Sequence, residues 1–280
     1  MRIGVVVLPE FPWPRAREVW QQIERMGFAH AWTYDHLSWR MFHDKPWYAA
    51  MPALTAAAAV TERIRLGTLV ASPNFRHPVS FAREVVTLDQ ISGGRFILGF
   101  GAGGLGYDAT ALGHPAWSTA ERSGRYREFV EMLDRLLTER TLTGTGDWYA
   151  AQDARAYAHG GQQPRVPFYL AATGPKGMRL VATHGQGWVT HDPPGQLTDQ
   201  IARFEQACHD TGRNPAEPAR LIVADSRDRR PLVSLEAFRD AVGHYTDLGF
   251  TDLVVHYPRP DQPYQADPAV LEQIAADLTP

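Results

Sequence analysis

The chain has 280 residues, 44% of them hydrophobic and 21% charged, with a formal net charge of −3. This length fits one large domain or two small ones, and the slightly acidic balance gives no broad basic surface, so we expect no nucleic-acid partner. Cys208 is the only cysteine, which excludes an internal disulfide bond and a metal site built from several cysteines.

The first segment, MRIGVVVLPEF, has one positive charge and a short apolar run before Pro9. A secretory signal peptide needs a longer apolar core and a cleavage site of small residues. No segment approaches the roughly 20 apolar residues of a membrane span. We therefore expect a cytoplasmic protein without membrane contact.

Short hydrophobic runs follow one another along the chain. Most are hydrophobic throughout instead of alternating with polar residues, as is typical of parallel strands covered on both faces. We expect strands over 2–8, 30–34, 65–71, 95–101, 166–171, 186–190, 220–225 and 252–257.

The segments between these runs have the spacing of amphipathic helices. In 78–91, Pro78 suits a first helical turn, and Val85, Leu88 and Ile91 share one stripe. We expect helices over 14–27, 50–62, 78–91, 119–138, 176–184, 196–211, 234–248 and 267–278.

Eight strands that alternate with eight helices predict an α/β fold, a parallel (β/α)8 TIM barrel, formed by a single domain over residues 1–280. An open doubly wound sheet would have the same alternation and stays an alternative. The connection over 140–165 has no obvious secondary structure, and another long connection runs over 35–46. Long connections are often functional, and the active sites of such barrels lie at the C-terminal ends of the strands.

The second predicted strand is followed by Asp35 and His36. An acid and a histidine at the mouth of a barrel suit proton transfer or contact with a bound ring. A structural aspartate that caps the next turn, with His36 as a bystander, explains the pair equally well.

The third strand leads into Ser72 and Asn74, and the fourth into the glycine-rich segment 99–104. Ser72 and Asn74 suit the recognition of a polar heterocycle, although both are also common turn residues. The glycines allow a ligand to lie close to the main chain. Their spacing resembles that of dinucleotide-binding sites only weakly, because such a site normally lies in the first strand–helix unit and these glycines follow the fourth strand.

The fifth strand is followed by the best candidate for an anion site, AATGPKG over 171–177. A helix that starts at Gly174-Pro175-Lys176 offers free N–H groups, the positive end of the helix dipole and a lysine. A phosphate would fit there, and an ordinary helix start is the alternative.

We expect no metal site. His36, His43 and Asp44 share one loop and His191 ends a strand, but none of the strong spacings of metal ligands is present. The cluster Arg227, Arg229 and Arg230 is read as a solvated loop or as a contact for an anionic ligand tail.

Three stretches together resemble the bacterial luciferase-like monooxygenase superfamily, which includes FMN-dependent monooxygenases and coenzyme F420-dependent oxidoreductases. They are FAHAWTYDHLSW (28–39), the long stretch 63–104, and PFYLAATGPKGMRLVATHGQGWVT (167–190). The resemblance implies a flavin or deazaflavin at the mouth of the barrel. It also implies a non-proline cis peptide behind the ring, at Leu69–Val70 or one residue away.

The resemblance also assigns roles to residues. His36 is the expected proton donor or acceptor, oriented by Asp35. The expected cofactor-binding residues are Leu69, Val70, Ser72, Asn74, Gly101, Ala102, Gly103, Thr173, Gly174, Pro175, Lys176 and Gly177.

The expected function is two-electron (hydride) transfer between coenzyme F420 and a small organic substrate, by a protein that forms a homodimer. The alternatives are an FMN-dependent monooxygenase that uses O2 and a flavin reductase partner, a non-catalytic flavin-binding protein, and a metal-dependent hydrolase using Asp35, His36 and His191. The sugar-phosphate dehydrogenases of the superfamily carry a glutamate where Gly104 and Leu105 stand here, which puts that substrate in doubt.

Overall fold

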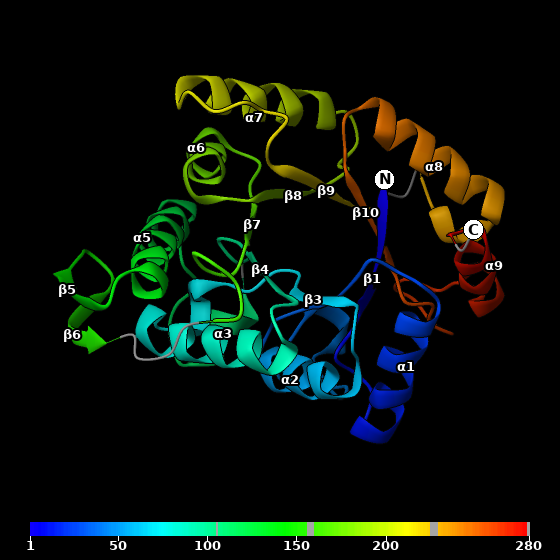
Figure 1. Ribbon diagram of the computed structural model, residues 1–280, viewed down its shortest axis with the longest axis horizontal. Helices are drawn as coiled ribbons and strands as arrows, with labels where there is room; N and C mark the ends of the chain where they lie inside the picture. Colours follow the sequence, from blue (N-terminus) through cyan, green and yellow to red (C-terminus); the bar gives the residue numbers. More distant parts are fainter. Residues whose placement is uncertain (105, 156–159, 225–228, 279–280) are drawn as a thin grey trace.

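The computed structural model describes residues 1–104, 106–155, 160–224 and 229–278, and its centre is a closed barrel of eight parallel strands (Figure 1). Around the barrel the strands follow the order β1-β10-β9-β8-β7-β4-β3-β2. The predicted (β/α)8 barrel is confirmed, and the open sheet is excluded because β1 pairs with β10. The strands are β1 (Arg2–Val7), β2 (His30–Thr33), β3 (Arg65–Thr68), β4 (Phe96–Phe100), β7 (Phe168–Ala171), β8 (Gly187–His191), β9 (Ala219–Val223) and β10 (Asp252–His256).

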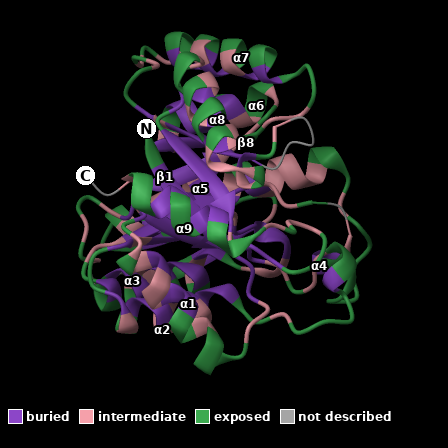
Figure 2. Cartoon of the chain, turned by 90° about the vertical axis from the view of Figure 1, so that its right-hand side faces the viewer, coloured by how far each residue is buried: buried purple, intermediate pink, exposed green. Residues whose placement is uncertain are grey.

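The predicted helices surround the strands, with buried inner faces and exposed outer faces (Figure 2). They are α1 (Trp13–Arg25), α2 (Ala50–Val60), α3 (Pro78–Ser92), α5 (Thr119–Thr138), α6 (Pro175–His184), α7 (Leu197–Asp210), α8 (Leu235–Asp247) and α9 (Pro268–Leu278). One detail is corrected: Ile91 is 46% exposed, and Ser92 takes the buried position on α3 instead. The Ser92 hydroxyl donates to the carbonyl of Asp89 and accepts from the N–H of Arg95, which satisfies it inside the fold.

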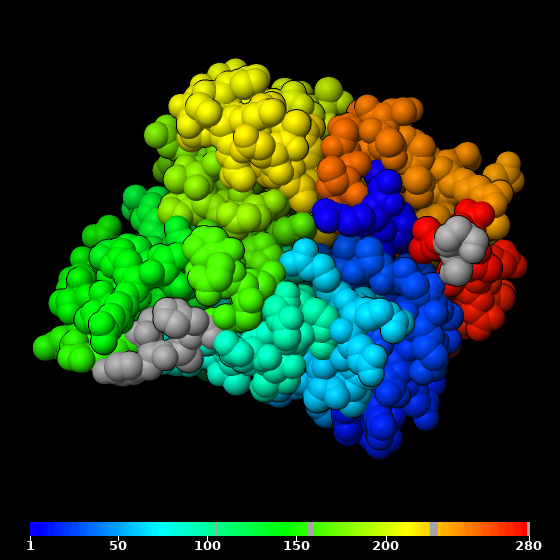
Figure 3. Space-filling model, viewed as in Figure 1, coloured from blue at the N-terminus to red at the C-terminus, as the bar shows by residue number. Residues whose placement is uncertain are grey.

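The barrel interior is packed with side chains. A space-filling view of the face in Figure 1 has no central opening (Figure 3). At the N-terminal end, Asp252 accepts hydrogen bonds from Arg2 (2.7 Å) and His30 (2.9 Å). Burial raises the pKa of Asp252, but the hydrogen bonds from His30 and Arg2 outweigh it and bring it to about 2. This network ties the N-terminal ends of β1, β2 and β10 together.

The expectation that 140–165 lacks secondary structure is wrong. An antiparallel hairpin of β5 (Thr141–Thr145) and β6 (Ala150–Arg155) lies there. Leu142 is buried, while the carboxylate of Glu128 on α5 accepts three backbone N–H groups of the turn, over 147–149. The hairpin therefore forms because α5 supplies both an apolar surface and an acceptor for the turn.

Four short helical turns complete the described chain: η1 (Arg40–Phe42), η2 (Pro73–Phe75), α4 (Tyr107–Thr110) and η3 (Pro231–Val233). Helix α4 lies on the side of the barrel away from the N-terminus (Figure 2), where the strands end. Within the residues that the structure describes, no helix is long and apolar enough to cross a membrane.

Candidate active site

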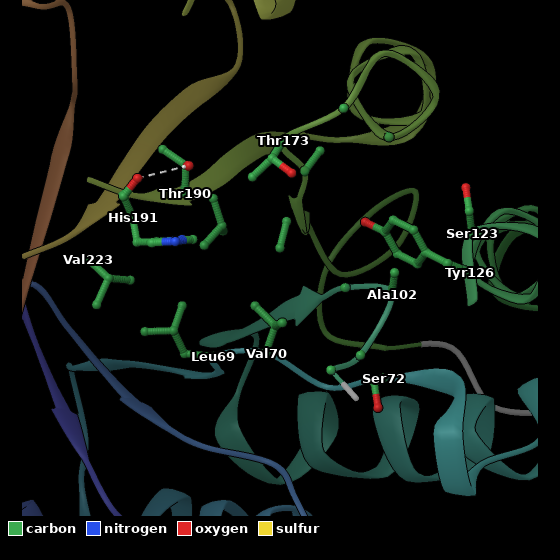
Figure 4. A pocket seen from close by; sticks show the side chains of 18 of the residues that line it. Leu69, Val70, Ser72, Ala102, Ser123, Tyr126, Thr173, Thr190, His191 and Val223 are labelled. Carbon is green, nitrogen blue, oxygen red and sulfur yellow. Dashed lines mark hydrogen bonds between the residues drawn. The ribbon is translucent and has the colours of Figure 1, made fainter. Parts of the chain in front are cut away.

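A cavity of about 820 Å³ opens at the C-terminal ends of the strands. Leu69 and Val70 form one wall and Thr173 lies on the opposite one (Figure 4). Most of the residues that the sequence analysis assigned to the cofactor line this one space: Leu69, Val70, Ser72, Gly101, Ala102, Gly103, Thr173, Gly174, Pro175, Lys176 and Gly177. His36 lines it too, so segments far apart in the chain meet at one site.

The end of β3 contains the non-proline cis peptide bond Leu69–Val70, where the resemblance had placed it. The end of β4 passes very close to this segment. A Cβ atom at Gly101 would lie 2.8 Å from Cγ2 of Val70, and one at Gly103, whose φ is +75°, would lie 2.5 Å from Nδ2 of Asn74. Glycine is therefore required here by the contact between two chain segments, and it also leaves this part of the wall without side chains.

Ser72 and Asn74 are both buried, but their surroundings differ. Ser72 lines the cavity, and within the described residues its hydroxyl has no hydrogen-bond partner. Asn74 lies against Gly103 and does not line the cavity, but its Oδ1 likewise has no partner within the described residues, so its contact with the ring stays a prediction. Because buried polar groups are nearly always paired, the Ser72 hydroxyl is available to a polar ring bound in the cavity.

The predicted phosphate turn lies at the start of α6. Gly174 is the N-cap residue, Pro175 occupies the first turn, and no side chain caps the helix. The carbonyl of Thr173 accepts from Arg203 (3.2 Å), and Trp188 donates to the carbonyl of Ala172 (3.0 Å). These contacts hold the turn in place, and Gly174, Pro175, Lys176 and Gly177 all line the cavity, an arrangement that suits an anion.

His36 is held by a residue that sequence reasoning missed. Its Nδ1 lies 2.7 Å from Oδ2 of Asp108 in α4, and Oδ1 of the same carboxylate accepts the N–H of Leu37 at 2.8 Å. The ring also stacks on Trp39, with 25° between the planes. The expectation that Asp35 orients His36 is therefore wrong. No motif around Asp108 distinguishes it in the sequence.

Asp35 instead pairs with Arg76. The two side chains are buried, with Oδ2 2.5 Å from Nη1 and Oδ1 3.0 Å from Nη2. Burial raises the pKa of the Asp35 carboxyl, and the charge of Arg76 opposes that effect. The guanidinium also lies over the ring of Phe75, 4.3 Å from its centroid. This ion pair ties the end of β2 to the start of α3, which is a structural role.

Tyr34, at the end of β2, also lines the cavity. Its hydroxyl lies 2.8 Å from Nε2 of His256, at the end of β10, and His256 stacks on Tyr264 with ring centroids 3.3 Å apart. Burial lowers the pKa of His256 to about 3, so the ring is neutral near neutral pH. The rule that selected His36, a polar residue at a strand's C-terminal end, would also have found His256.

The metal-dependent alternative has no ligand set in the described part of the chain. No three His, Cys, Asp or Glu side chains gather there in a way that could hold an ion. Asp35 is paired with Arg76 and His36 with Asp108. Of the arginine cluster, Arg227 lies outside the described residues, and the guanidinium of Arg229 lies over the ring of Tyr245.

Comparisons with known proteins agree with this geometry. A family model described as luciferase-like monooxygenase matches residues 1–247. An F420-dependent glucose-6-phosphate dehydrogenase of Beutenbergia cavernae is 29% identical, over 92% of this chain and 90% of that protein. A 4-hydroxyprotoasukamycin monooxygenase of Streptomyces nodosus is 32% identical, over 77% of this chain and 60% of that protein.

The fold is also shared with a solved structure. Coenzyme F420-dependent tetrahydromethanopterin reductase from Methanopyrus kandleri superposes with a TM-score of 0.77 at 19% identity, covering 98% of this chain and 97% of that one. The family model includes all three stretches on which the resemblance rested. The chain therefore belongs to the luciferase-like monooxygenase family.

Proposed function

We propose that the chain is an oxidoreductase that binds coenzyme F420 in the 820 Å³ cavity and catalyses hydride transfer between F420 and a small organic substrate. One observation carries this proposal. The same cavity joins an uncapped helix start with Lys176, a buried Ser72 hydroxyl without a partner, and His36 held by Asp108. An anion site, a ring site and a proton-exchanging group are what such a reaction requires.

The deazaflavin supplies the two-electron chemistry when bound, and the protein binds it, orients it and excludes water. Lys176 and the N–H groups at the start of α6 hold the phosphate. The segment Leu69–Val70 and the glycine-rich end of β4 support the ring, with the Ser72 hydroxyl as a polar contact. Relatives such as the Beutenbergia cavernae dehydrogenase, which carries F420 dependence in its name, favour this cofactor.

His36 exchanges a proton with the substrate in this proposal. Because Asp108 engages Nδ1, Nε2 is the ring nitrogen left for a substrate oxygen. The Asp108 carboxylate fixes the orientation of the ring, which is the role first expected of Asp35. Such a positioned group contributes typically 10²- to 10⁴-fold to the rate of proton transfer.

The cavity wall also bears on the substrate. Trp39, Val189, Val223 and Tyr264 give it a largely apolar and aromatic side, which suits an organic molecule with one or a few oxygen atoms. Gly104 has no side chain to offer where the sugar-phosphate dehydrogenases carry a glutamate, so we do not propose glucose 6-phosphate as the substrate despite the name of the relative.

The test is a parallel titration of the purified chain with F420 and FMN, followed by quenching of the cofactor fluorescence. We expect tighter binding of F420. Reduction of the bound deazaflavin by candidate alcohols, or its oxidation by candidate acceptors, then identifies the reaction. Binding of neither cofactor would refute the proposal.

An FMN-dependent monooxygenase that uses O2 and a flavin reductase partner is the second candidate. The phosphate turn would also accept FMN, and the relative from Streptomyces nodosus is named a monooxygenase. Preferred binding of FMN, with substrate oxygenation only when a reductase is added, would establish it. Tight binding with no electron exchange with any acceptor would instead favour a non-catalytic flavin-binding protein.

Two organisational features belong to the same proposal. We propose a single domain over residues 1–280, since the pairing of β1 with β10 joins the two ends of the chain in one barrel. We also propose a homodimer, on the resemblance alone. Light scattering of the purified protein measures the oligomeric state, and cooperative unfolding in one transition would support the single domain.

A further inference from the structure

A second, smaller cavity continues outward from the active site between α5 and α6. Its volume is about 330 Å³, and it shares the residues Ser123, Tyr126, Lys176 and Gly177 with the larger cavity. Figure 4 shows Ser123 and Tyr126 of α5 at the edge of the active site, facing the side on which α6 begins. We call this second cavity the α5–α6 groove. It starts at the predicted phosphate turn, because Lys176 borders both spaces.

The groove is lined by positive charge without counter-charge. Arg127 on α5 and Arg179 on α6 face it together with Lys176. Among the described residues, no carboxylate lies within 4.0 Å of these three cations, although Arg135, further along α5, pairs with Glu139 at 2.7 Å. In a chain of net charge −3, three uncompensated cations around one groove create a local positive potential that attracts an anionic ligand.

The spacing places these charges along one path. Arg127 follows Ser123 by four residues on α5, and Arg179 follows Lys176 by three on α6, so each pair shares one helix face. A ligand with phosphate at the start of α6 would therefore meet Lys176 first and the two arginines further out. Tyr126 lines both cavities, but its hydroxyl donates to the carbonyl of Phe100 at 3.0 Å and is not available to the ligand.

We infer that the α5–α6 groove binds the acidic tail of coenzyme F420, the glutamate chain that follows its phosphate. This inference rests on the proposed function. FMN ends at its phosphate and leaves the groove empty, so Arg127 and Arg179 select the deazaflavin by its charge. The arginines contribute to affinity and specificity, and they take no part in hydride transfer.

The test compares the affinity of the whole chain for F420 without glutamates, F420 with several glutamates, and FMN, each measured by fluorescence quenching at low salt. Wild-type protein should bind the form with several glutamates more tightly, and added salt should remove the difference. The double variant Arg127→Glu/Arg179→Glu should raise the Kd for this form about tenfold, since each reversal turns a weak attraction into a repulsion. Its Kd for FMN should stay within about twofold of the wild-type value.

Two matched variants control for general effects. Arg127→Lys/Arg179→Lys keeps the charge and should keep the preference for the glutamate-bearing form. Arg17→Glu changes the net charge by the same amount per site, on α1 across the barrel from the groove (Figure 1), and should leave all three Kd values at wild-type levels. Thermal unfolding checks that each variant is folded.

The outcomes separate this inference from the proposed function. Equal affinity of the wild type for F420 with and without glutamates overturns the groove assignment but leaves F420 as the cofactor. Unchanged binding by the double variant overturns it as well. If neither form of F420 binds while FMN does, both the groove assignment and the F420 proposal fall.

Discussion

Histidine 256 should make the protein less stable as the pH falls from 7.5 to 5. Burial lowers its pKa in the folded state to about 3, whereas an unfolded histidine has a pKa of about 6.5. Above pH 6.5 both states are neutral at this residue and it contributes no pH dependence. Below pH 6.5, His256 is protonated in the unfolded chain but stays neutral in the folded chain, so the free energy of unfolding decreases as the pH falls.

The magnitude follows from the pKa difference. Each pH unit between about 6.5 and 3 removes about 1.4 kcal/mol, so at pH 5 the loss due to His256 is about 2 kcal/mol. Burial also lowers the pKa of His30, so His30 likewise reduces the free energy of unfolding as the pH falls. The variant His256→Gln removes only the first contribution and keeps an acceptor for the Tyr34 hydroxyl.

The assay is urea unfolding of wild type and His256→Gln at pH 7.5 and 5.0. The free energy of unfolding should fall by about 2 kcal/mol more in the wild type than in the variant. The comparison uses differences between the two pH values, so a lower stability of the variant at pH 7.5 does not affect it. His209→Gln, at an exposed position on α7, should behave as the wild type. Equal losses in the wild type and His256→Gln would show that the folded protein protonates His256 readily and would refute the reasoning.

Four further predictions concern the active site. His36→Ala should lower turnover by about 10²-fold or more while the Kd of the cofactor stays nearly constant; a parallel loss of both would remove His36 from the proton transfer. Asp108→Asn should lower turnover by roughly tenfold with little change in unfolding free energy, because it acts through the orientation of His36. Asp35→Asn should instead lower the free energy of unfolding by about 3–5 kcal/mol and change turnover little, since it leaves the buried charge of Arg76 unpaired. Urea unfolding and steady-state kinetics distinguish the Asp108→Asn and Asp35→Asn variants. A large loss of turnover in an Asp35→Asn protein of normal stability would show that Asp35 takes part in catalysis. Lys176→Ala should weaken binding of FMN by about tenfold but leave the affinity for riboflavin, which lacks the phosphate, unchanged; equal effects on both ligands would contradict a phosphate contact.

The site could be predicted from sequence to the extent that it depends on where strands end. The ends of parallel strands in a barrel share one rim, so residues that follow the hydrophobic runs come together whatever the exact packing. Ser72, Gly101, Thr173 and Lys176 lie around one cavity for this reason. The cis bond Leu69–Val70 was placed by the resemblance and not by any periodicity.

The choice of side-chain partners could not be predicted. Asp108 reaches His36 from 72 residues away, and Tyr34 meets His256 across 222 residues of chain. Asp35 stands next to His36 in the sequence, yet its carboxylate pairs with Arg76. Neighbours in an extended segment point in different directions, so adjacency along the chain predicts little about contact.

The sequence by itself determined the alternation of eight strands with eight helices and the segments that follow each strand, because these follow from hydrophobic periodicity that each segment carries alone. Only the tertiary structure decided that the sheet closes into a barrel, which carboxylate holds His36, and that 141–155 folds as a hairpin on α5. These features depend on distances between segments that are remote in the chain, and such distances are set only when the whole barrel has packed.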